Sequence, residues 1–168
     1  MEPMKGRTLT IEGFPGDFVR NKNIAGDPEK NRYGGTSRTF TIRLTPEYVK
    51  LFEDNGFPVK YPQDVQPGHE PEPYAAIVLF PEPKYNYKAS EVVGDDGVSA
   101  RLLSPDKWKE FDWSPIEYID ADLRTYGTQR GTIAITADLL YFHTKNSALR
   151  TKLAAVFAQD DDLEPAPF

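Results

Sequence analysis

Cysteine is absent from the 168 residues, and histidine occurs only at positions 69 and 143. The missing thiols exclude a disulfide framework, a cysteine nucleophile and a thiolate metal site, and they are typical of a reducing cytoplasm. Two distant histidines provide little material for a His-rich metal centre or a His-based triad. No apolar run approaches the ~18 residues that cross a bilayer, and the first ten residues lack the apolar core of a secretion signal. We therefore expect a cytoplasmic protein with no membrane segment and no cofactor.

A basic excess is also missing, because 20 Lys and Arg face 26 Asp and Glu, for a net charge of −6. Domains that bind polyanions usually carry the opposite balance. The acids are unevenly distributed, however. Residues 61–125 hold 13 acidic and 6 basic side chains, and residues 160–168 hold four acids and no base. The remaining segments are mildly basic, so the total charge does not exclude nucleic-acid binding by part of the chain.

Fifteen prolines, twelve glycines and 12% aromatic residues favour an ordered β-rich fold with many turns. Alternating hydrophobicity predicts strands at residues 7–14, 38–44, 74–80, 116–126 and 132–143, with 74–80 covered on both faces. Shorter extended pieces are expected at 57–61 and on both sides of a turn at 94–97. Polar residues 15–37 predict a loop or an irregular hairpin. A small closed barrel is the most economical arrangement of these strands, because it leaves no sheet edge exposed.

Three helices are expected between and after the strands. Thr45 and Pro46 provide a cap and a first helical residue, and Gly56 ends that helix. Its apolar stripe is Tyr48, Leu51 and Phe52. A second, short helix begins at residues 104–105, and residues 146–157 have the periodicity of an amphipathic helix.

Basic and aromatic residues alternate at positions 84–88, as Lys84, Tyr85, Tyr87 and Lys88. Bases stack on aromatic rings for about 1–3 kcal/mol each, and lysines neutralise neighbouring phosphates. This pattern is therefore typical of a single-stranded nucleic-acid site. The alternative is an exposed strand whose tyrosines cover part of the core.

A second basic–aromatic group surrounds Phe40, which is flanked by Arg38 and Arg43. Strand alternation predicts Phe40 in the core and Arg43 on the opposite face, where it can reach a phosphate. Lys60 follows in the next extended piece, and we include it in the predicted nucleic-acid site.

Three aspartates form a possible metal site, with Asp120 and Asp122 on one strand face and Asp138 on a predicted neighbour. Metal-dependent nucleases hold magnesium with such groups. The alternative is that these carboxylates accept ordinary hydrogen bonds. No matching Glu, His or Lys constellation accompanies them, so we predict no metal.

The C-terminal tail combines an acidic run, Asp160, Asp161 and Asp162, with Pro167 and a terminal Phe168. Acidic runs are usually plain solvated tails. A flexible acidic peptide ending in an aromatic ring and a free carboxylate can also dock into a basic, apolar-lined pocket. It can equally compete with nucleic acid for the protein's own basic groove.

These last nine residues resemble the C-terminal tip of bacterial single-stranded DNA-binding proteins, which ends in three aspartates, an aliphatic residue, proline and phenylalanine. Here residues 164–166 separate the acids from the Pro-Phe pair. The body, loosely over residues 20–145, resembles the phage-type single-stranded DNA-binding proteins. The similar stretches are residues 24–26, 31–35, 38–42 and 55–60, together with the order of the later strands.

The resemblance implies an OB-fold domain over residues 1–158 and a disordered acidic tail over 159–168. It implies no enzymatic activity, a role on single-stranded DNA in replication, recombination and repair, and recruitment of replication or recombination proteins by the tail. A homodimer is compatible with the sequence. The predicted DNA contacts are Arg38, Arg43, Lys60, Lys84, Tyr85, Tyr87 and Lys88. The alternatives are a phage-encoded module that engages a host protein through its acidic surface, and the magnesium-dependent nuclease.

Overall fold

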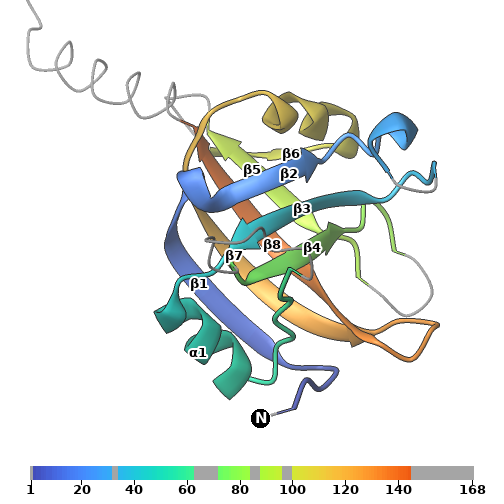
Figure 1. Cartoon of the computed structure of the whole chain (residues 1–168). Coiled ribbons are helices and arrows are strands. Elements are labelled where there is room, and N and C mark those ends of the chain that lie inside the picture. The colour runs from blue at the N-terminus through green and yellow to red at the C-terminus, as the bar shows by residue number, and fades with distance from the viewer. Residues whose placement is uncertain (1, 32–33, 63–71, 84–87, 96–99, 145–168) are drawn as a thin grey trace, which may run out of the picture.

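A computed structural model describes residues 2–31, 34–62, 72–83, 88–95 and 100–144 (Figure 1). The predicted helix at 146–157 and the acidic tail lie outside the described residues. Within them the chain is mainly β, with short helical segments between strands. The strands are β1 (Thr8–Pro15), β2 (Val19–Asn23), β3 (Arg38–Arg43), β4 (Tyr74–Leu79), β5 (Glu91–Asp95), β6 (Ala100–Leu103), β7 (Ile116–Gly127) and β8 (Ile133–Thr144).

The strands form one open, mixed sheet in the order β1-β7-β8-β4-β3-β2. Neighbours in this order are antiparallel except β4 and β8, which run parallel with Ile77 opposite Ile135. The β5–β6 hairpin extends the sheet, because β5 also pairs in parallel with the second half of β8. This mixed sheet is strongly curved in Figure 1, with β1 and β2 joined by a short turn.

Strand alternation places the core on the inner side of this curved sheet. In β3, Phe40 and Ile42 are fully buried, while Thr39, Thr41 and Arg43 are half-buried on the other face. Phe40 contacts Phe142 of β8 edge-to-face, with ring centroids 6.0 Å apart. The strands predicted at 7–14, 38–44, 116–126 and 132–143 are therefore confirmed. The strand predicted at 74–80 is also present as β4, but only one of its faces is buried, and the other is half-buried and not fully covered as predicted.

Helix α1 (Pro46–Asp54) follows β3 as the sequence predicts. The Thr45 hydroxyl accepts a hydrogen bond from the Tyr48 amide at 3.5 Å, and Gly56 ends the helix with φ of 76°. Phe52 is buried and Tyr48 contacts Phe14 of β1 edge-to-face, with centroids 4.9 Å apart. Leu51, predicted in the apolar stripe, is instead 38% exposed, because the helix packs against the sheet through a narrower face.

The 3₁₀ helix η3 (Pro105–Asp112) covers one end of the core. Its Trp108 and Phe111 are buried, and Phe111 stacks on Phe142 with centroids 4.4 Å apart. Gly94 of β5 is required here, because a Cβ at this position would lie 2.9 Å from the Phe111 ring. The short helix predicted from residue 104 is confirmed in position, in the tighter 3₁₀ form.

The closed barrel predicted from the sequence is wrong, because the strands form an open sheet with β1 and β2 at its ends. The prediction of a loop or an irregular hairpin at residues 15–37 is correct only in part. This segment contains η1 (Gly16–Phe18), strand β2 and η2 (Pro28–Lys30), not a loop alone. The β2 sequence, Val-Arg-Asn-Lys-Asn, has weak strand propensity. It becomes a strand because it pairs with β3, with Val19 opposite Ile42 and Arg20 opposite Thr41.

Candidate nucleic-acid interface

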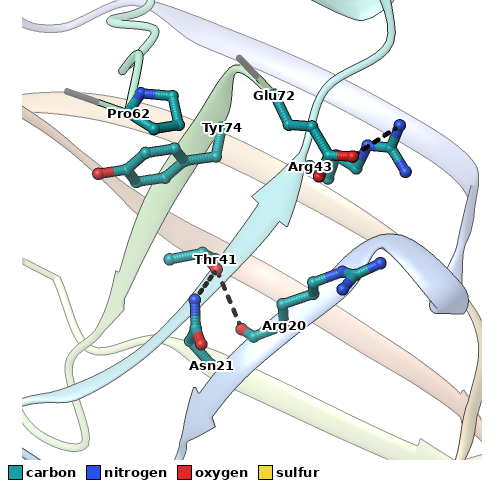
Figure 2. A pocket seen from close by; sticks show the side chains of 7 residues that line it. All are labelled: Arg20, Asn21, Thr41, Arg43, Pro62, Glu72 and Tyr74. Atoms are coloured by element: carbon teal, nitrogen blue, oxygen red, sulfur yellow. Dashed lines mark hydrogen bonds and ion pairs between the residues drawn. The ribbon is translucent and has the colours of Figure 1, made fainter. Parts of the chain in front are cut away.

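A cavity of about 250 Å³ opens where β2, β3 and β4 lie next to each other (Figure 2). Its lining combines two guanidinium groups, an aromatic ring, a proline ring and small polar groups. The residues are Arg20, Asn21, Thr41, Arg43, Pro62, Glu72 and Tyr74. The two arginines and one glutamate leave the lining with an excess of positive charge.

The pairing of β3 with β4 sets the floor of this cavity. Arg43 lies opposite Tyr74, and Thr41 lies opposite Ala76. Both β3 residues belong to its outward face, because Phe40, Ile42 and Leu44 point into the core. The same alternation buries Ala75, Ile77 and Leu79 of β4 and leaves Tyr74 half-buried on the outside.

An irregularity in β2 brings its polar groups to the cavity. The register with β3 shifts between Arg20 and Asn23, and Asn21 has a left-handed backbone with φ of 52°. Asparagine tolerates this conformation better than most residues. The side-chain amide of Asn21 donates to the Thr41 hydroxyl at 3.1 Å, and that hydroxyl donates to the Arg20 carbonyl at 3.2 Å. These bonds hold β2 in place and leave the Arg20 side chain exposed.

Arg43 is held in position by two contacts and remains partly accessible. Its guanidinium forms an ion pair with Glu72 at 3.2 Å, and its Cζ lies 5.3 Å from the centre of the Phe18 ring. The Arg43 side chain is 39% exposed. Exposed ion pairs contribute only about 0–1 kcal/mol, so an incoming phosphate can replace Glu72 at little cost.

Lys60, another predicted contact, lies next to the same cavity. Its amide donates to the Tyr74 carbonyl at 2.8 Å, and the Tyr74 amide donates back to the Lys60 carbonyl at 2.9 Å. This bridge continues the ladder from Arg43 through Tyr74 to Lys60. Lys60 is exposed. The structure therefore brings together two of the residues predicted from the sequence, Arg43 and Lys60.

Arg38 lies at the other end of β3, away from this cavity. Its guanidinium donates to the Pro105 carbonyl at 2.7 Å and lies 5.3 Å above the Trp108 ring. Both contacts attach β3 to η3. Arg38 is half-buried, and its side chain packs against η3 and does not line the cavity.

Lys88 is exposed just before β5, and its neighbour Ser90 exchanges hydrogen bonds with Phe80 at the end of β4. It is therefore separated from Tyr74 by the length of β4. The other three members of the 84–88 pattern, Lys84, Tyr85 and Tyr87, lie outside the described residues, and their role stays a prediction.

Of the seven residues that line the cavity, the sequence predicts only Arg43 as a contact, and Arg20 and Tyr74 are the most important of those it missed. Arg20 lies in the segment interpreted as a loop, and Tyr74 in a strand interpreted as buried on both faces. A signal for Tyr74 is present in the sequence. Ala75, Ile77 and Leu79 form one continuous apolar set, which assigns position 74 to the opposite face.

The second cation of β2, Lys22, has a structural role. Its ammonium group donates to the carbonyls of Phe111 at 2.7 Å and Ser114 at 3.0 Å. Burial lowers the pKa of Lys22, while the nearby Asp112 carboxylate opposes that shift. Lys22 thus joins β2 to the end of η3 and is not available in the cavity.

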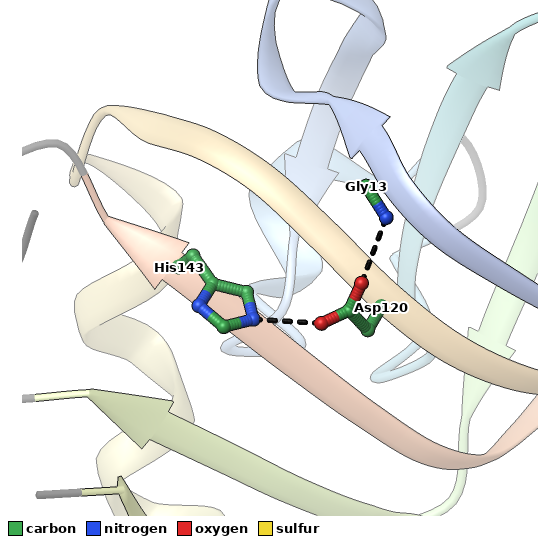
Figure 3. A network of polar contacts seen from close by, with 3 residues as sticks. All are labelled: Gly13, Asp120 and His143. Carbon is green, nitrogen blue, oxygen red and sulfur yellow. Dashed lines mark hydrogen bonds and ion pairs between the residues drawn. The ribbon is translucent and has the colours of Figure 1, made fainter.

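The three aspartates of the metal hypothesis lie on the neighbouring strands β7 and β8, as predicted, but each has a protein partner. Asp120 accepts from the Gly13 amide and contacts His143 Nε2, both at 2.8 Å (Figure 3). Asp122 accepts from the Thr10 hydroxyl at 2.6 Å, and Asp138 pairs with Arg124 at 2.7 Å. Among the described residues, no group of three acidic or histidine side chains could hold a metal ion.

The His143 ring lies between two tyrosine rings on the same face. Its centroid is 3.9 Å from that of Tyr118 and 3.7 Å from that of Tyr141, and both pairs are stacked. With Asp120, this cluster fastens β1, β7 and β8 to each other. Asp120 and Asp122 line a different cavity, with Thr10 and Tyr141, so these β7 carboxylates are not part of the lining that contains Arg20 and Arg43.

No family model, curated protein or solved structure matches the chain. Of the helices in the described ranges, none has the length and apolar character needed to cross a bilayer.

Proposed function

We propose that the protein binds single-stranded DNA, without sequence preference, across the outer face of β2, β3 and β4. The observation that carries this proposal is the cavity whose lining combines Arg20, Arg43 and the ring of Tyr74, with Lys60 beside it. Guanidinium groups can neutralise phosphates, and an aromatic ring can stack any base. Neither contact reads a base edge, so binding of this kind is tolerant of sequence.

The connectivity of the sheet supports the finer proposal of an OB-like arrangement. The chain passes from β1 through η1 directly into β2, so these can be counted as one bent first strand. In the order of the open sheet, the β2 part of this first strand is followed by β3, β4, β8, which is parallel to β4, and β7, and the β1 part lies at the other end. OB-folds bind oligonucleotides on the face of their second and third strands. In this count those strands are β3 and β4.

In this proposal the protein is not an enzyme. It protects exposed single strands during replication, recombination and repair in the cytoplasm, and the acidic tail recruits the proteins that act there. The recruiting role proposed for the tail is based on its sequence alone.

The proposal can be tested by fluorescence anisotropy with a labelled oligothymidylate. A length of about 16 nucleotides is near the upper site size for one such domain. We expect saturable binding at low salt that weakens steeply as salt is raised, because counterions are released from the strand. A duplex of equal length should compete poorly, since its bases cannot reach Tyr74. Absence of binding at low salt, or equal competition by duplex, would contradict the proposal.

A further inference from the structure

The two tryptophans of the chain differ sharply in exposure. Trp108 is 1% exposed within η3, whereas Trp113, which follows the end of that helix, is 69% exposed. No other large apolar side chain among the described residues is more exposed. Tryptophan is highly buried on average, and it is enriched among the residues that contribute most to binding interfaces.

The backbone that carries Trp113 is fastened on both sides. Lys22 of β2 donates to the carbonyls of Phe111 and Ser114, which bracket the exposed residue. The Asp112 carboxylate accepts from the amides of Ile24 at 2.6 Å and Ala25 at 3.0 Å.

Further contacts fix the ends of this segment. The Ser114 hydroxyl donates to the Glu110 carbonyl at 2.7 Å, and the Phe111 ring is stacked in the core on Phe142. The indole is thus presented from a rigid base. Because the backbone at Trp113 is already held in place, a ligand that contacts this residue does not have to order the backbone.

The strand that anchors Trp113 also lines the proposed DNA site. Lys22 is two residues from Arg20 in β2, and Arg20 lines the cavity. Figure 1 shows η3 beside β2, while β2 pairs with β3 on its other side. A single strand that leaves the cavity across β2 therefore arrives at the end of η3. Adjacent strands are about 4.8 Å apart, so this extension is short on the scale of a polynucleotide.

We propose that Trp113 is a second base-stacking platform, engaged by single strands that extend from the cavity across β2 to the end of η3. This inference rests on the proposed function. Every base has a π-face, and the indole offers the largest aromatic surface of any side chain. The binding path then begins at Tyr74 in the cavity and ends at Trp113. A protein partner that uses Trp113 as its anchor is the competing explanation.

Tryptophan emission reports directly on this contact, because the exposed Trp113 and the buried Trp108 are the only two indoles. Oligothymidylates of about 4 and about 16 nucleotides, which bracket the usual site sizes, are added to the full chain. We expect the longer strand to quench the emission of the wild type. The emission of Trp113→Phe, which comes from Trp108, should stay constant.

Affinities from anisotropy complete the test. Trp113→Ala should lower the affinity for the 16-nucleotide strand about 5- to 150-fold, the loss expected for one stacked base. The affinity for the 4-nucleotide strand should not change. Leu102→Ala removes a side chain that is 65% exposed on β6 and is the matched control, expected to change neither affinity. Urea midpoints should equal that of the wild type, because both side chains face solvent.

The outcomes separate this inference from the proposed function. If Trp113→Ala binds the longer strand as tightly as the wild type, and no quenching occurs, Trp113 is not a DNA contact although DNA binding itself stands. Loss of a protein partner in Trp113→Ala with unchanged DNA affinity would likewise overturn the inference. If neither oligonucleotide binds the wild type at low salt, the proposed function fails as well.

Discussion

Tyr74→Leu should weaken the binding of oligothymidylate about 5- to 150-fold, whereas Tyr74→Phe should keep most of the affinity. The range follows from a stacking contribution of about 1–3 kcal/mol for each base. Tyr74 supplies the aromatic ring of the cavity between β2, β3 and β4. Leucine fills a similar space without a π-face, and phenylalanine retains the ring and loses only the hydroxyl. Titration by anisotropy at fixed salt measures the difference.

The fold should tolerate both substitutions, because the Tyr74 ring lies on the outer, half-buried face of β4. Far-UV circular dichroism and urea midpoints verify this. Equal affinity for Tyr74→Leu and the wild type would show that the ring does not stack a base. Equal weakening by leucine and phenylalanine would instead assign the effect to the hydroxyl, and the stacking account would be wrong.

Gly16→Ala should lower the free energy of unfolding by about 3 kcal/mol or more, at or beyond the upper end of the usual cost of overpacking. A Cβ at Gly16 would lie 1.8 Å from the carbonyl oxygen of Ile116 and 2.4 Å from its carbonyl carbon. Both are backbone atoms, so no side-chain rotation can relieve the clash. Gly16 begins η1, where the chain turns from β1 into β2. Urea unfolding followed by circular dichroism measures the loss.

Gly35→Ala provides the matched control, since no atom lies within 4 Å of its added Cβ. We expect a change within about 0.5 kcal/mol, as for most surface substitutions. A Gly16→Ala protein as stable as the control would mean that the turn between β1 and β2 does not pack on β7. The position of β2, and with it Arg20, would then be wrong.

The strands that the sequence predicts well are those whose own residues alternate. Phe40 and Ile42 in β3 show the pattern, as do Ile119, Ala121 and Leu123 in β7. Helix α1 is equally clear, because Thr45, Pro46 and Gly56 mark both of its ends. These signals are local, so they can be recognised without knowledge of the partners in the fold.

Strand β2 could not be predicted in this way, because its structure depends on a partner about twenty residues away. Its residues are polar, and only pairing with β3 makes them a strand. The same reason explains why the sequence predicts only part of the proposed interface. The charges of Arg43 and Lys60 predict them as contacts, whereas Arg20, which lines the cavity, falls in a segment interpreted as a loop. Arg38 has the same local pattern as Arg43, but its partners in η3 lie 67 residues away in the chain and cannot be inferred from spacing.

Trp113 was also missed, and for a related reason. A tryptophan is expected to be largely buried, as Trp108 is. Its exposure follows from how Lys22 and Asp112 attach the end of η3 to β2 and the residues after it. These contacts join segments about 90 residues apart, so only the folded structure separates the two tryptophans.

The most direct test of the central claim is the salt dependence of oligothymidylate binding by the double variant Arg20→Gln/Arg43→Gln. Each cation that neutralises a phosphate of a single strand contributes about 0.7 to the slope of log affinity against log salt. The double variant should therefore bind with a slope about 1.4 smaller in magnitude than the wild type. Lys50→Gln, an exposed charge on α1, should leave the slope unchanged. If the double variant keeps the wild-type slope, the strand does not cross the face of β2, β3 and β4, and the proposed interface is wrong.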